Sequence, residues 1–349
     1  MNREFASKED MKMIQGIAVM LMVFHHLFGF PDRITVSYHT MFNLMGIHLE
    51  NILAYFGRIC VVIFSFCSGY GLYRKTLNSI QNNVWTIQKG YKNIFQSIEK
   101  FYLRYWIVVV FFLPYGFCKQ IYKFEPLQFV KNILGIACTY NKEWWYVYTY
   151  IKLLISFPIL FWFIFTMIKK GHRKLLFIIS LSIISLTVFI ECLKDTSKTG
   201  YLTYLISFYM GMVVGEFYLF EKMGDIISSL KILKGSIVFG ILAFAVGIRI
   251  FITSKIDFLI APIIIFCLIY WLHSKWAISP FKYLLYIEGK NTQYIWLTHT
   301  FFAYYYFQKQ LYSMGNSLLI YIECLIICTC IGIVLEFILQ RLRNVVIRE

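Results

Sequence analysis

The chain has 349 residues, of which 59% are hydrophobic and only 15% are charged, and its mean hydropathy is +0.64. A soluble domain carries about 25% charged residues, so this chain lacks the charge to cover a soluble surface. Long, nearly uncharged runs recur along it, for example over 14–24, 153–168 and 317–339. Because about 20 apolar residues cross a bilayer core as a helix, the composition predicts a polytopic membrane protein. It excludes soluble enzymes, fibres and secreted disulfide scaffolds.

The net charge of +16 comes from Lys and Arg in short clusters between apolar runs. This spacing is typical of membrane anchoring and argues against a nucleic-acid partner. The nine cysteines follow no metal or redox spacing, and three of them, Cys324, Cys328 and Cys330, lie inside one apolar run. Free cysteine behaves there as a small hydrophobe, so we expect no metal site.

The apolar runs predict an all-α bundle of about ten transmembrane helices in a single membrane domain, residues 1–349. With both termini cytoplasmic, the inside segments hold 22 Lys and Arg and the outside segments hold 10, as the positive-inside rule requires. The apolar segment 127–138 is too short to span and is expected to be interfacial or re-entrant. The predicted spans are 12–30, 51–73, 103–118, 144–168, 174–192, 201–220, 235–252, 258–273, 291–308 and 316–339.

Two adjacent histidines lie within the first span. Counted from Lys12, His26 lies about 21 Å up the helix, in the outer half of the membrane. Arg58 lies seven residues into the second, descending span, which places it near the same depth. A lone membrane histidine is usually a helix–helix hydrogen bond, but two histidines level with an arginine favour a polar cavity. Since neighbours on a helix point about 100° apart, only one of His25 and His26 is expected to face it.

Basic residues cluster on the predicted cytoplasmic side. Arg74 ends the second span, and Lys100 and Arg104 stand among aromatic residues where the third begins. One interpretation is positive-inside anchoring with an aromatic belt. The other is a binding surface for a phosphate-bearing cofactor, which arginine suits by bidentate bonding.

Two further segments carry polar groups beside predicted spans. Gly289 followed by Lys290 predicts a helix start whose free N–H groups suit an anion, with His299 about 10 Å above the inner face. The alternative is a simple cap plus one packed histidine. The segment 143–146 is an acidic–aromatic run at the outer end of span four. Its aromatics suit a membrane interface, and Glu143 is a candidate for binding sugar hydroxyls.

Taken in chain order, five segments resemble the acyltransferase 3 family of multi-pass membrane acyltransferases. In that family a basic residue precedes the first-helix histidine by eleven positions, where this chain has Gln15, and two arginines are common where only Arg104 is present. Lys12, Lys100 or Arg74 is available to supply the missing charge. The segments are 14–26 ending in His26, 62–70 ending in Ser68-Gly69-Tyr70, 101–104 ending in Arg104, Trp144-Trp145-Tyr146 with Phe157-Pro158, and 294–299 ending in His299.

The resemblance implies transfer of an acyl group, usually acetyl, from cytoplasmic acetyl-CoA or another acyl-CoA to a hydroxyl of a cell-surface or exported glycan. His26 is then the general base or a covalent acyl relay, with His25 as its partner candidate, and Arg58 stabilises developing negative charge. The implied acyl-CoA ligands are Arg104, Lys100, Arg74, Lys290 and His299. The acceptor-site candidates are Glu143, Trp144, Trp145 and Ser68.

Two other functions compete with this one. A transporter, or a flippase for a lipid-linked sugar, also needs a polar cavity among helices, but such proteins often show two related halves and no internal repeat is evident here. A scaffold subunit of a glycan-synthesis complex would not need His26 and Arg58 at one level. The abundance of Ile, Lys, Phe, Tyr and Asn hints at an AT-rich bacterial source, hence the bacterial cytoplasmic membrane. The acceptor glycan, the acyl chain length and the oligomeric state stay open.

Overall fold

The computed structural model describes residues 5–41, 43–44, 47–80, 85–194, 200–230, 234–252, 254–275 and 277–346. Within these ranges the named secondary-structure elements are helices, apart from one short antiparallel pair, β1 (Asn43–Leu44) and β2 (Ile47–His48), and loops join them. Four of the basic residues counted for the orientation lie outside the described residues: Arg3, Lys198, Lys231 and Arg348.

The prediction of a polytopic all-α membrane protein is confirmed. Among the described residues, seven helices are long and apolar enough to cross a membrane, or eight if a pair bent by 62° forms one span. The count of ten and the position of the termini stay predictions. The seven are Lys8–Phe28, Leu49–Asn78, Ile87–Cys118, Lys142–Lys169, Arg173–Leu193, Lys234–Phe251 and Ser317–Asn344, and the bent pair is Tyr201–Phe217 with Leu219–Ser229.

The chain divides into two compact units. The first comprises Met1–Ala18, Ile59–Ile94 and Leu153–Gly289, and the second comprises Val19–Arg58, Phe95–Lys152 and Lys290–Glu349. Each boundary therefore falls within or between apolar helices rather than in a linker.

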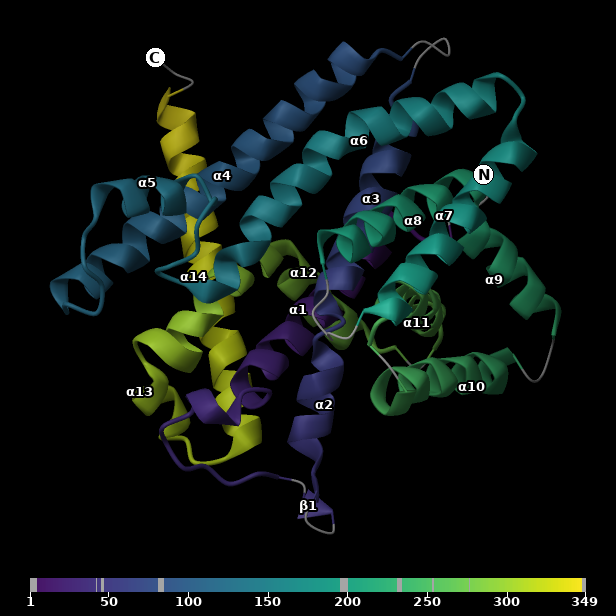
Figure 1. Ribbon diagram of the computed structural model, residues 1–349. Helices are drawn as coiled ribbons and strands as arrows, with labels where there is room; N and C mark the ends of the chain where they lie inside the picture. The colour runs from purple at the N-terminus through teal and green to yellow at the C-terminus, as the bar shows by residue number, and fades with distance from the viewer. Residues whose placement is uncertain are drawn as a thin grey trace. The chain divides into compact units, whose positions relative to one another are not determined.

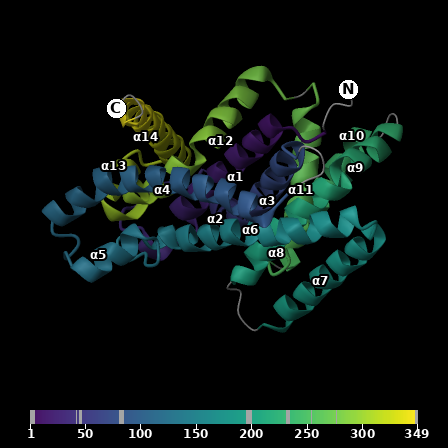
Figure 2. The same ribbon diagram turned by 90° about the horizontal axis from the view of Figure 1, so that it is seen from above.

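In the first unit, α3 and α8 pack side by side along their lengths (Figure 1). Glycines allow this approach, because a Cβ on Gly69 would lie 1.9 Å from the Phe208 carbonyl oxygen and one on Gly211 would lie 2.2 Å from that of Phe66. Figure 2 shows α7 beside this group. Its complete elements are α3 (Cys60–Asn78), α7 (Arg173–Leu193), α8 (Tyr201–Phe217), α9 (Leu219–Ser229), α10 (Lys234–Gly247), the π-helical turn η4 (Ile248–Ile252) and α11 (Asp257–Leu272).

Helix α12 (Ser279–Thr300) corrects the prediction of a helix start at Gly289. Gly289 lies inside the helix, where a Cβ would stand 1.9 Å from the carbonyl oxygen of Lys12 in α1 (Lys8–Phe28). Gly16 makes the reciprocal approach, 2.0 Å from the Leu285 carbonyl oxygen. Gly289 is thus a helix-crossing residue, and no free N–H groups for an anion arise there. The true start signal is Pro280, in the first turn where proline is favoured.

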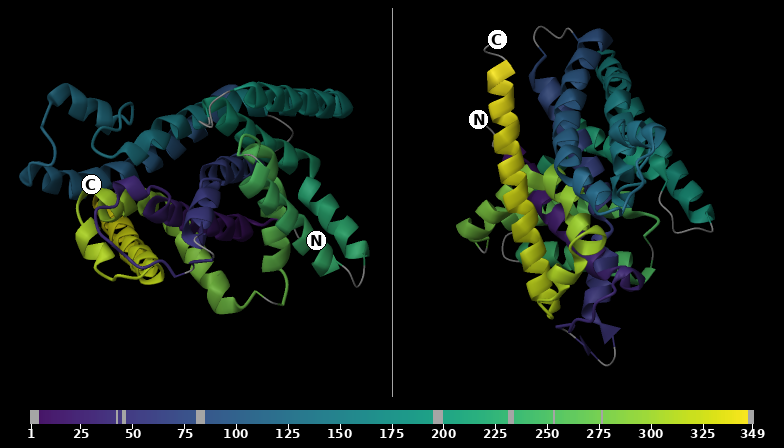
Figure 3. Two further views of the ribbon diagram at one scale, coloured as in Figure 1. Left: turned by 60° about the horizontal axis from the view of Figure 1, so that its bottom comes forward. Right: turned by 90° about the vertical axis from the view of Figure 1, so that its left-hand side faces the viewer.

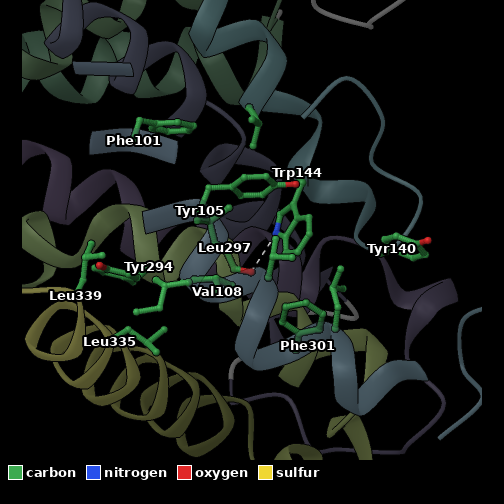
Figure 4. Packing of buried hydrophobic residues seen from close by; sticks show 14 residues of the cluster. Phe101, Tyr105, Val108, Tyr140, Trp144, Tyr294, Leu297, Phe301, Leu335 and Leu339 are labelled. Atoms are coloured by element: carbon green, nitrogen blue, oxygen red, sulfur yellow. Dashed lines mark hydrogen bonds between the residues drawn. The ribbon is translucent and has the colours of Figure 1, made fainter. Parts of the chain in front are cut away.

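The second unit has an aromatic core around Trp144 (Figure 4). The Trp144 ring is 1% exposed, and its Nε1 donates to the Leu297 carbonyl oxygen at 3.0 Å. The long straight helix α14 closes one side of this core (Figure 3, right). The unit's complete elements are η1 (Pro31–Arg33), β1, β2, α2 (Leu49–Gly57), α5 (Pro126–Ile133), η2 (Lys142–Trp145), the π-helical turn η5 (Phe301–Tyr305), α13 (Gln308–Tyr312) and α14 (Ser317–Val346).

Several predicted spans differ in detail from the observed helices. The predicted second span breaks into α2 and α3, with Arg58 and Ile59 between them. The predicted span 201–220 bends at Tyr218, whose φ of 53° is left-handed. Helices α4 (Ile87–Cys118) and α6 (Tyr146–Lys169) each contribute to both units, and α4 begins well before the predicted residue 103.

Candidate functional site

Two histidines that are far apart in the sequence meet in the second unit. His26 lies in the last turn of α1 and His299 in the last turn of α12. Nδ1 of His26 and Nε2 of His299 are 2.8 Å apart, and the ring centroids are 4.8 Å apart. His299 is fully buried, whereas His26 is partly exposed. We call this pair the His26–His299 dyad.

Backbone carbonyls decide where the protons of the dyad lie. Nδ1 of His299 is 3.0 Å from the Ile295 carbonyl oxygen and 2.9 Å from that of Trp296. Carbonyl oxygens only accept, so this nitrogen carries hydrogen, and in a neutral ring the other nitrogen is then an acceptor. Nε2 of His299 therefore accepts from the Nδ1–H of His26. This assignment leaves the lone pair of His26 on its Nε2, where the ring is able to take a proton.

His25 points in another direction. Its Nδ1 donates to the carbonyl oxygen of Ala54 in α2 at 2.7 Å. The close packing of α1 and α2 at this level depends on Gly57, where a Cβ would lie 2.4 Å from the Leu21 carbonyl oxygen and 3.1 Å from the His25 Cβ. Arg58 follows Gly57 at the end of α2 and is half-buried. Its backbone therefore lies level with the histidines of α1.

The predicted depth of His299 was wrong relative to His26. Counting from a helix start at residue 291 separates the two by about 11 Å, yet their rings are in contact. The reason is that α12 begins at Ser279, twelve residues earlier. His299 thus lies near the end of a long helix instead of near the start of a short one.

A second polar group, absent from the sequence prediction except for Glu143, lies close to the dyad. Arg33 Nη1 is 2.7 Å from Glu143 Oε1, and the Tyr305 hydroxyl donates to Glu143 Oε2 at 2.8 Å. Burial lowers the pKa of Arg33, but the hydrogen bond and charge of Glu143 outweigh it and raise that pKa overall. Both His26 and His299 interact electrostatically with this pair, His26 with Arg33 and His299 with Glu143.

The two tryptophans beside Glu143 differ in environment. Trp144 belongs to the buried core of the second unit, whereas Trp145 is 40% exposed. The core position of Trp144 suits packing, so Trp145 is the better placed of the two to meet a ligand. Arg33 was overlooked because it stands outside the predicted first span. Its place seven residues after His26, close behind the end of α1, was the available signal.

Comparison with known families decides the class of the protein. A family model for an acyltransferase domain, that of the acyltransferase 3 family, matches residues 9–338. The chain belongs to the acyltransferase 3 family. No curated protein and no solved structure matches it significantly. It is therefore a multi-pass membrane acyltransferase, and the dyad and the Arg33–Glu143 pair both lie within the matched region.

The predicted donor ligands of the acyltransferase fall in different surroundings. Arg104 forms a bidentate pair with Glu336, with Nε–Oε2 at 2.9 Å and Nη2–Oε1 at 3.2 Å, and the Tyr294 hydroxyl donates to the same carboxylate at 2.8 Å. Glu336 was not predicted, although a carboxylate in so apolar a helix as α14 is an informative signal. Lys100 and Lys290, also in the second unit, are exposed.

Two predicted residues of the acyltransferase belong to the first unit. Arg74 donates to the Gly215 carbonyl oxygen at 3.4 Å, and its guanidinium lies 4.5 Å from the Tyr218 ring centroid. Ser68 is half-buried on α3. Among the described residues, no three His, Cys, Asp or Glu side chains gather as a metal site requires.

Proposed function

We propose that the acyltransferase transfers an acyl group, acetyl most naturally, from cytoplasmic acyl-CoA to a hydroxyl of a cell-surface or exported glycan. The observation that carries this proposal is the dyad, in which backbone carbonyls and His299 leave a lone pair on Nε2 of His26. A hydroxyl is a poor nucleophile until a base takes its proton, and a positioned histidine contributes about 10²–10⁴-fold in rate to such a step.

In the direct mechanism, Nε2 of His26 takes the proton of the acceptor hydroxyl as its oxygen attacks the thioester carbonyl. The tetrahedral intermediate then breaks its carbon–sulfur bond, and the departing CoA thiolate receives the proton from His26. In the relay mechanism, Nε2 itself attacks the thioester, and the departing CoA thiolate takes up the Nδ1 proton of the acylated imidazole. The acceptor hydroxyl then attacks the acyl group, the carbon–nitrogen bond breaks, and the hydroxyl proton returns to the imidazole. Arg58, level with the histidines, is the proposed stabiliser of the negative charge on the carbonyl oxygen.

The proposed donor site lies on the cytoplasmic side. Arg104, Lys100, Arg74 and Lys290 are its candidate phosphate ligands, since guanidinium and ammonium groups pair with phosphate oxygens. Arg104 would exchange its Glu336 partner for a phosphate. This arrangement rests on about ten spans in one membrane domain of the bacterial cytoplasmic membrane, with both termini inside as the 22 to 10 charge asymmetry favours.

The acceptor is proposed to approach from the outer side. Glu143 and the exposed Trp145 are its candidate contacts, with Trp144 supporting them from the core and Ser68 as a candidate on the other unit. Carboxylate oxygens accept from sugar hydroxyls, and an exposed indole offers a flat apolar face.

CoA release from acetyl-CoA by the purified protein in lipid nanodiscs tests the proposal, with a glycan extract of the host cell as acceptor. We expect acceptor-dependent release that His26→Ala abolishes. His172→Ala is the matched control, because His172 is exposed before α7 and its side chain caps no N–H group of that helix. Full turnover by the His26→Ala protein, or no release and no acetyl-CoA binding by the unmodified protein, would overturn the proposal.

A further inference from the structure

The Arg33 side chain lies between two aromatic rings at the outer end of α1. Its guanidinium carbon is 4.4 Å from the Phe30 ring centroid and 5.3 Å from that of Tyr304. Stacking of this kind fixes the plane of the guanidinium and leaves its edge for hydrogen bonding. Only one nitrogen is within hydrogen-bond distance of Glu143, and 37% of the side chain is exposed.

Glu143 is held more firmly than a surface carboxylate. Its side chain is only 7% exposed, and Arg33 and Tyr305 each bind one of its oxygens. Its backbone N–H donates to Asn141 Oδ1 at 3.1 Å, and its carbonyl oxygen accepts from Trp296 Nε1 at 3.1 Å. The carboxylate is therefore preorganised, so a ligand that binds it loses little side-chain entropy from the protein.

The rings that hold Arg33 also touch the base. The Tyr304 hydroxyl donates to the backbone carbonyl of His26, and the Phe30 ring is nearly parallel to the His26 ring, with centroids 6.1 Å apart at 16°. A ligand that binds the guanidinium of Arg33 is thus separated from the His26 ring by the Phe30 ring alone. Because η5 and α12 are continuous in the chain, the same helix end positions both His299 and Tyr304.

We propose that Arg33 and Glu143 form an acceptor subsite that binds an uncharged, polyhydroxylated sugar and directs one of its hydroxyls to His26. This inference rests on the proposed function. Arg33 contributes only donors and Glu143 only acceptors, so together they match neighbouring hydroxyls, each of which donates and accepts. The pair has no net charge, so a carboxylate on the sugar would gain from Arg33 about what it loses to Glu143, and the pair gives an acidic sugar no advantage over an uncharged one.

The alternative role for this pair is a latch that ties the turn after α1 to η2. Acceptor kinetics separate the two roles. The acceptors are the host glycans, divided by anion exchange into an uncharged and an acidic fraction. Arg33→Gln is expected to raise the KM for the uncharged fraction about tenfold or more, as loss of a charged hydrogen bond does, with the KM for acetyl-CoA unchanged. Lys119→Gln, which removes an exposed cation stacked on Tyr115 in the same unit, is the control.

Glu143→Gln gives the second readout. It leaves Arg33 without its counter-charge, so the ratio of kcat/KM for the acidic fraction to that for the uncharged fraction is expected to rise. A latch predicts equal losses for both fractions with a lowered Tm, and that result, or preference of the unmodified enzyme for the acidic fraction, would overturn the inference. If His26→Ala abolishes turnover while both acceptor KM values stay unchanged in these variants, only the subsite is wrong. If His26→Ala retains turnover, or neither fraction is acylated, the proposed function fails as well.

Discussion

His299 sets the direction of the His26 lone pair, so its replacement tests the proton assignment directly. His299→Phe keeps a planar ring in a fully buried position and removes the nitrogen that accepts from His26 Nδ1. His299→Gln removes the ring but offers an amide oxygen near the position of Nε2. The two variants therefore separate packing from hydrogen bonding.

The magnitude follows from the bond that is lost. The His26 ring also hydrogen-bonds the Met22 backbone, so losing the His299 nitrogen costs about one ordinary hydrogen bond, about 0.5–1.5 kcal/mol, which corresponds to about a 2- to 13-fold loss in kcat if the cost falls on the transition state. Without an acceptor at the His299 position, the tautomer of His26 that carries its hydrogen on Nε2 would become more populated, and that hydrogen would occupy the lone pair that the proposed mechanism uses. We expect His299→Phe to show this loss and His299→Gln to recover most of it. Both losses should be smaller than that of His26→Ala.

The assay is steady-state CoA release in nanodiscs, with kcat and the KM for acetyl-CoA determined separately and the Tm of each variant measured alongside. The reasoning predicts a change in kcat at constant donor KM. Equal kcat values for the Phe and Gln variants would show that His299 acts by packing alone. Wild-type kcat in His299→Phe would refute the proton assignment altogether.

Three further predictions concern folding, the donor site and a loop thiol. Gly289→Ala places a Cβ against the Lys12 backbone and is expected to cost about 1–3 kcal/mol of stability by overpacking, which a lower Tm would show. Gly240→Ala is the control, because open space surrounds Gly240 and the Tm should not fall. Arg104→Gln should raise the KM for acetyl-CoA and Glu336→Gln should lower it, because the latter frees the guanidinium; a lower Tm with constant KM in both would indicate a purely structural pair. Burial, helped by the charge of Glu143, raises the pKa of the Cys138 thiol. Since only the thiolate is alkylated, its maleimide labelling from the outer side should need a higher pH than that of a model thiol, and labelling only from the inner side would contradict the orientation.

The local sequence pattern was enough to predict helices whose apolar run is clearly bounded by polar residues. The first residues of α7 and α14 lie within one residue of the predicted starts, because each helix is an uncharged run that begins directly after polar residues. The start of α12 was missed because Gly289 is ambiguous locally: glycine ends helices, and it also lets helices cross. Only the backbone of Lys12 against it decides which applies.

The site shows the same division between local and tertiary information. His26 stands out in the sequence because an ionisable residue in an apolar run is costly. The sequence analysis placed its partner, His299, among the acyl-CoA ligands. The contact between His26 and His299 depends on which turn of α12 lies opposite α1, and no local sequence pattern contains that information. Arg33 was missed for a related reason, since a cation after a helix end is ordinarily a membrane anchor, and its stacking on Tyr304 joins residues 271 positions apart in the chain.

The π-helical turn that follows His299 has a consequence for how this enzyme can vary. A π turn holds one residue more than an α turn at the same place, and such bulges are frequent at functional sites. Within η5, Tyr304 reaches the carbonyl of His26 and Tyr305 reaches Glu143. Loss of one residue from 301–303 would restore the α-helical register and rotate both hydroxyls by about 100°, while His299, upstream, would keep its place. A single codon deletion would thereby displace two tyrosine hydroxyls at once and leave the His26–His299 contact in place.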